Sequence, residues 1–65
     1  MKEYTNSQIS ALIDEHIHSA RDREILKRRL CDGARYEPLA EEFGLSVQRV
    51  KEIVYRAKGK LIRHL

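Results

Sequence analysis

The sequence predicts an all-α protein, a small bundle of about four helices that contains a helix-turn-helix. Apolar residues recur at three- and four-residue spacing in stretches of helical length. Glycines follow two of these stretches, where helix ends favour a left-handed residue. A chain of 65 residues buries only about 60% of its unfolded surface. We therefore expect one domain over residues 1–65, with its helices around a single core.

The first predicted helix spans about Ser7–His18, with Asn6 or Ser7 as its cap. Its apolar residues fall on one face: Ile9, Leu12, Ile13 and Ile17. This stripe has two interpretations. It covers the core formed by the later helices, which we prefer, or it forms a homodimer or docks on another protein.

A second helix is predicted over residues 20–31. Its core residues are expected to be Ile25, Leu26 and Leu30. Acidic residues near its start and basic residues near its end match the helix dipole: Asp22, Glu24, Lys27, Arg28 and Arg29. Gly33 supplies the backbone angle that ends it.

Residues 36–58 form the predicted helix-turn-helix. A short helix over Tyr36–Phe43 is followed by Gly44, where a Cβ would cost energy. Leu45 fills the angle between the helices, and Ser46 caps the next one. The core stripe of that second helix is Val50, Val54, Ala57 and Leu61. Residues 59–65 either continue this helix or bend away, with Ile62 and Leu65 free to pack on helix 7–18 or to pair in a dimer.

The charge is concentrated in two stretches, although the net charge is only +3. From Ser46 onward there are six basic residues against one acid, and residues 21–29 hold five against two. A basic helix beside the acidic helix 36–43 suits oriented docking on phosphates. A solvated helix surface with ordinary charge pairs is the alternative.

Other classes of function lack support in the residues. The lone Cys31 fits a reducing compartment and a partly buried apolar role. No apolar run approaches the ~20 residues of a membrane span, and the N-terminus lacks the core of a signal peptide, so a cytoplasmic protein is expected. His16 and His18 diverge on a helix, and His64 has no neighbour at ligand spacing. We therefore expect no enzyme activity, no metal and no cofactor.

The run from Arg21 to Leu61 resembles region four of sigma-70-type bacterial sigma factors, the segment that reads promoters. The resemblance is carried by RDREILKRRLCDG, then YEPLAEEF, GLS, VK and RAKGKL. Two positions depart from the family pattern. Arg35 replaces a usual Ser or Thr cap, and Pro38 replaces a polar residue, which predicts a weakly capped helix that begins late.

The resemblance implies which residues face the bases of DNA, and the basic residues near them suit its phosphates. The base-reading candidates are Val47, Gln48, Lys51 and Glu52. The phosphate candidates are Arg35, Arg49, Tyr55, Arg56 and Lys58. Two alternatives stay open: Glu52 pairs with Arg56 within the helix instead of reading a base, and Tyr36, as we prefer, packs under the turn instead of touching a sugar or phosphate.

The predicted function is sequence-specific binding of double-stranded DNA, as a transcription regulator or a sigma-factor-like accessory protein. The sequence looks like a detached region four of the kind that phage or mobile-element regulators carry. The resemblance also implies contact with the β-subunit flap of RNA polymerase. The alternative function is an adaptor that binds RNA polymerase or a sigma factor and has incidental affinity for DNA.

Overall fold

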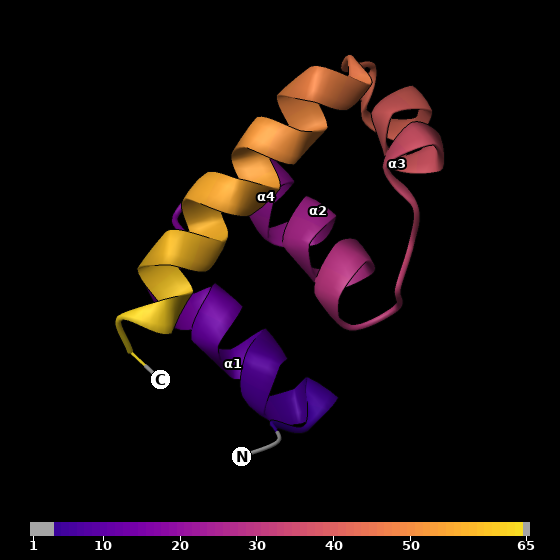
Figure 1. Ribbon diagram of the computed structural model, residues 1–65. Coiled ribbons are helices and arrows are strands. Elements are labelled where there is room, and N and C mark those ends of the chain that lie inside the picture. Colours follow the sequence, from indigo (N-terminus) through magenta and orange to yellow (C-terminus); the bar gives the residue numbers. More distant parts are fainter. Residues whose placement is uncertain (1–3, 65) are drawn as a thin grey trace.

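The computed structural model describes residues 4–64, and these residues form an all-α bundle of four helices. The helices are α1 (Asn6–His16), α2 (Ala20–Leu30), α3 (Tyr36–Phe43) and α4 (Val47–Ile62). In Figure 1, α4 runs along the molecule, with α3 at its N-terminal end and α1 near its C-terminal end. α2 packs against all three of the others. No helix of this described region is long and apolar enough to cross a membrane.

One apolar core joins the four helices. The buried core residues are Ile13, Ile17, Ile25, Leu26, Leu39, Ala40, Val50, Ile53, Val54, Ala57 and Leu61. Every residue of the predicted α4 stripe is among them. Ile53, which lies beside that stripe, was missed because the spacing was followed along a single line of the helix. Ile9, Leu12, Leu30 and Phe43 are partly buried at the edges of the core.

α1 covers the core, as preferred, but its predicted bounds were wrong. Thr5 caps the helix through a hydrogen bond from the backbone N–H of Gln8 at 3.2 Å, and the side chain of Gln8 accepts from Thr5 N at 2.8 Å. Because of this reciprocal capping box, Thr5 is the N-cap, and the predicted caps Asn6 and Ser7 were wrong. The helix ends at His16 because Ile17 turns to extended backbone, which still buries its side chain. His18 therefore lies outside the helix.

α2 ends one residue earlier than predicted, with Cys31 as its C-cap rather than its last helical residue. Gly33 has the expected positive φ of 71°. Ser19 caps the start of α2 by accepting from Asp22 N at 3.3 Å. Two ion pairs join neighbouring helices: Lys27 to Asp14 at 2.7 Å and Arg28 to Glu42 at 2.8 Å.

α3 does not begin late. It starts at Tyr36, so Glu37 is helical although the residue before a proline is biased away from helical angles. The missing N–H of Pro38 lies in the first turn, where it has no helical partner to lose. The predicted weak cap is confirmed, since Arg35 makes no side-chain cap hydrogen bond. At the other end of the chain, α4 continues through Gly59 to Ile62. Ile62 is 66% exposed, so it does not pack closely on α1; the expectation for Leu65 lies outside the described residues.

Candidate nucleic-acid interface

The turn between α3 and α4 sets the direction in which α4 leaves the core. Gly44 adopts φ 66°, and its N–H points to the carbonyl oxygens of Ala40 and Glu41. Leu45 N donates to Ala40 O at 2.8 Å, while its side chain packs against the core. Ser46 then accepts from Arg49 N at 3.1 Å and caps α4. Three consecutive residues thus fix the start of α4, as the sequence predicted for each of them.

The first two turns of α4 present a mixed polar strip to solvent. Gln48 and Glu52 are exposed, and Val47 and Lys51 are partly buried at its edge. None of these four side chains belongs to the buried core. Tyr55 continues the strip one turn later and is 60% exposed. Most of this strip is therefore exposed to solvent, while Val47 also packs against the core.

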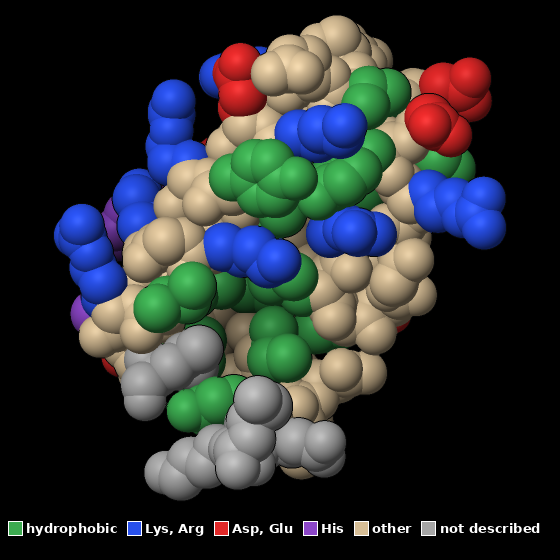
Figure 2. All heavy atoms as spheres, in the orientation of Figure 1, with side chains coloured by type: hydrophobic (Ala, Val, Ile, Leu, Met, Phe, Trp, Pro, Cys, Tyr) green, Lys and Arg blue, Asp and Glu red, His purple; other side chains and the backbone are tan. Residues whose placement is uncertain are grey.

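Basic side chains lie on both flanks of this strip. A helix turns about 100° per residue, so Lys51 and Lys58 share one flank while Arg49, Arg56 and Lys60 share the opposite one. Figure 2 shows one face of the molecule, with Lys and Arg side chains interspersed among apolar ones over α4 and acidic ones towards the edges. A cylinder with a polar front and cations on both sides is suited to lie between two phosphate backbones.

The Lys51 flank meets α2 and α3 at a shallow hollow around Tyr36. The hollow is lined by Arg29, Arg35, Tyr36, Glu37, Val47 and Lys51. The guanidinium carbon of Arg29 lies 4.4 Å from the centre of the Tyr36 ring, and Lys51 Nζ lies 5.7 Å from it. Tyr36 is thus a partly buried ring that attracts cations from two other helices, and not only a packing residue under the turn.

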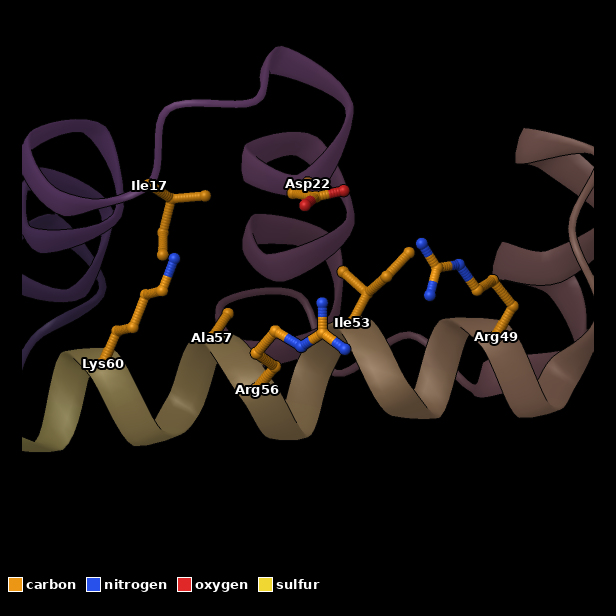
Figure 3. A pocket seen from close by; sticks show the side chains of 7 residues that line it. All are labelled: Ile17, Asp22, Arg49, Ile53, Arg56, Ala57 and Lys60. Carbon is orange, nitrogen blue, oxygen red and sulfur yellow. The ribbon is translucent and has the colours of Figure 1, made fainter.

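The Arg49 flank faces the first turn of α2 across a second hollow. In Figure 3, Arg49, Arg56 and Lys60 rise from α4 around this hollow and Asp22 faces them from α2. Asp22 already accepts from Arg21 Nε at 3.2 Å. Arg49 donates to Glu52 Oε2 at 3.3 Å. The predicted pair of Glu52 with Arg56 was therefore wrong. Glu52 pairs instead with Arg49, three residues before it in α4.

The remaining candidates occupy exposed positions. Arg35, Arg56 and Lys58 are exposed on the surface, although Lys58 lies near the C-terminal end of α4 and borders an apolar groove. Two further cations were missed as candidates. Lys60 follows Arg56 by four residues, so helical spacing alone could have found it. Arg29 could not have been found in this way, because only the loop between α2 and α3 brings it to Tyr36.

The groove beside Lys58 is apolar and lies between α1 and the end of α4. Its lining residues are Tyr4, Ile9, Leu12, Leu30, Lys58, Leu61 and Ile62. Ile62 projects from its wall. The groove is on the same flank of α4 as Lys51 but about two to three helical turns away.

The histidines and the cysteine make contacts that the spacing did not predict. The rings of His16 and His64 are stacked, with centroids 3.6 Å apart and planes 5° from parallel. Cys31 Sγ lies 3.7 Å from Asn6 O and is partly buried. Among the residues that the structure describes, no group of three or more His, Cys, Asp or Glu side chains could hold a metal ion.

Comparison with protein-family models, curated proteins and solved structures gives no match to this chain.

Proposed function

We propose that this protein binds double-stranded DNA in a sequence-dependent manner through the first half of α4, as a transcription regulator or sigma-factor-like accessory protein. The observation that carries the proposal is the exposed strip of α4 with cations on both of its flanks. The likeness of residues 21–61 to region four of sigma factors supports the same role.

The base-reading residues have complementary chemistries. Gln48 is suited to adenine through two hydrogen bonds, Lys51 to the acceptors of guanine, and Val47 to a thymine methyl group. Glu52 can accept from the amino group of cytosine with the oxygen that Arg49 does not hold. Since Arg49 and Glu52 are both about half exposed, their pair is weak and can open when a base approaches.

The cations provide affinity and register. The major groove is about 12 Å wide, close to the ~10–12 Å diameter of a helix with its side chains. With α4 in the groove, Arg49 and Arg56 face one strand, while Arg35 and Lys58 face the other from the side of α4 on which Lys51 lies. These contacts neutralise phosphates without reading sequence.

Selection of bound duplexes from a random library, combined with a salt titration of the best sequence, tests the proposal. If about five phosphates are neutralised, log K should fall with log salt concentration at a slope of roughly −4 to −5. A single short site would indicate a monomer or a polymerase-held module, whereas two half-sites in inverted repeat would indicate a dimer. Failure to bind any duplex, or a slope near zero, contradicts the proposal.

A second candidate function is that of an adaptor, and the apolar groove between α1 and the end of α4 favours it. In this version the groove docks on RNA polymerase or a sigma factor, and the basic helix is incidental. Retention of the pure protein on random duplex DNA at low salt, lost at high salt, supports the first function. Retention by polymerase alone supports the second.

A further inference from the structure

Tyr36 is the point at which three helices meet beside the proposed DNA-reading strip. It is the first residue of α3. Its ring has the Arg29 guanidinium of α2 at 4.4 Å and Lys51 Nζ of α4 at 5.7 Å from its centre. The electron-rich face of an aromatic ring attracts a cation within about 6 Å. One side chain of α3 therefore restrains a cation on each of its neighbours.

The Arg29 side of this arrangement is fixed by a second contact. Arg29 Nη1 donates to Ala34 O at 3.0 Å in a partly buried hydrogen bond. Ala34 is itself tied to α2, because its N–H donates to Arg28 O at 3.0 Å. These contacts hold the loop, Arg29 and the Tyr36 ring together. Lys51 lies near the same ring without such a hydrogen bond, so its position depends on the ring.

Within the described part of the chain, the Tyr36 ring is the group that attracts the Lys51 ammonium. No Asp or Glu lies within salt-bridge distance of Lys51 among residues 4–64. The charged groups that share its hollow are Arg29 and Arg35, which repel it, and Glu37, which is not within pairing distance. A free lysine side chain has a long, flexible stem that loses much of its rotamer freedom on binding. The ring removes part of that freedom before DNA arrives.

We propose that Tyr36 is a positioning residue that holds Lys51 over its ring in the orientation in which Lys51 reads a base. This inference rests on the proposed function for its effect on DNA, but the restraint on Lys51 is a property of the free protein. Tyr36 touches no base itself. Its hydroxyl is not needed, because the ring face supplies the attraction.

Two substitutions of Tyr36 distinguish the effect of its aromatic ring from the effect of its size. Tyr36→Phe keeps the ring, and Tyr36→Leu keeps an apolar side chain without it. Against the selected duplex we expect Tyr36→Leu to lose about two- to fivefold in affinity, the equivalent of one exposed cation–aromatic contact, and Tyr36→Phe to bind like the parent protein. Tyr36→Leu should also discriminate less against a changed base at the Lys51 position. With Lys51→Ala as background, the same replacement should have no further effect.

Nuclear magnetic resonance of the free protein tests the restraint without DNA. The ε-methylene protons of Lys51 should resonate upfield of those of Lys60, whose hollow has no aromatic lining residue and which serves as the internal control; they should do so in Tyr36→Phe as well. If Lys51 resonates with Lys60, the inference is overturned even if DNA binding holds. If the upfield shift is present but no duplex binds, the restraint stands and the proposed function fails. Equal affinity and equal base discrimination in the Tyr36→Leu and parent proteins, both folded by circular dichroism, also overturn the positioning role.

Discussion

Two residues on α4 illustrate how neighbouring cations on one helix can have different roles. Lys51 is partly buried beside the Tyr36 ring at the edge of the exposed strip. Arg56 is exposed on the opposite flank, at the rim of the hollow that faces α2. Under the proposed function, their positions on the helix rather than their charge assign Lys51 to a base and Arg56 to a phosphate.

Substitution of these two residues should have different effects on DNA binding. Lys51→Ala should change the preferred base at one position, with a loss of about 1–3 kcal/mol in discrimination there. Arg56→Ala should weaken binding to all duplexes about equally and make the salt slope shallower by about one. Affinities measured for a panel of single-base variants of the selected duplex, at several salt concentrations, check both. Equal changes across the panel for Lys51→Ala contradict its base-reading role.

Ser46 provides a test of the capping interaction that starts α4. Ser46→Ala removes the acceptor for Arg49 N–H and should lower the free energy of unfolding by about 1 kcal/mol. Ser7→Ala is the matched control, since Ser7 is exposed within α1 and Thr5 caps that helix. Urea unfolding followed by circular dichroism measures both. A control that loses as much stability as Ser46→Ala would show that capping is not the cause.

At the scale of the helix, α4 has a buried apolar face that packs on the core and an exposed face that carries polar and basic side chains. Its inner face contributes the buried residues Val50, Ile53, Val54, Ala57 and Leu61. Its outer face needs no apolar residues, which leaves it free for polar and basic side chains. The turn at Gly44 fixes how the helix leaves α3, whereas Gly59 lies within the helix, where it serves no turn.

The two glycines should respond to alanine with opposite sign. Gly44→Ala places a Cβ at φ 66° and should destabilise the fold by about 1–2 kcal/mol. Gly59→Ala meets nothing within 4 Å and should stabilise α4 by up to ~1 kcal/mol, because alanine favours the helix. Thermal unfolding of the two variants beside the parent protein measures the difference. A stabilising Gly44→Ala would contradict the left-handed conformation of the turn.

At the scale of the whole molecule, stability rests on a small apolar core joined by a few exposed ion pairs. Leu26 is fully buried where α2 meets the other helices. The ion pair of Arg28 with Glu42 connects α2 to α3 at 2.8 Å, but both side chains are about 40% exposed. An exposed pair contributes little, while a core leucine in so small a domain contributes a large part of the total.

Leu26→Ala should therefore cost about 2–5 kcal/mol and leave much of the protein unfolded at room temperature. Glu42→Gln should cost less than about 1 kcal/mol. Circular dichroism at 25 °C and a urea titration distinguish the two effects. A larger loss for Glu42→Gln than for Leu26→Ala would mean that the exposed ion pair, and not the core, holds α2 and α3 together.

Most of the fold could be predicted because its signals are local. The caps at Ser46 and Gly44, the α3 bounds and the apolar faces of α1 and α4 depend on residues within one or two turns. The start of α1 was predicted one residue too late because Thr5 and Gln8, which form the capping box, were not considered together. The late start predicted for α3 was wrong because the bias of Pro38 against a helical Glu37 did not prevent the helix from starting at Tyr36.

The sequence by itself determined that the chain is helical, where each helix begins and the first three end to within two residues, and which face of α4 is polar. Tertiary structure alone decided which side chains from distant parts of the chain come together: Arg29 and Lys51 at the Tyr36 ring, and His64 stacked on His16. The physical reason is range. Helix periodicity and caps act over a few residues, whereas contacts between side chains of different helices depend on how three loops place the helices together.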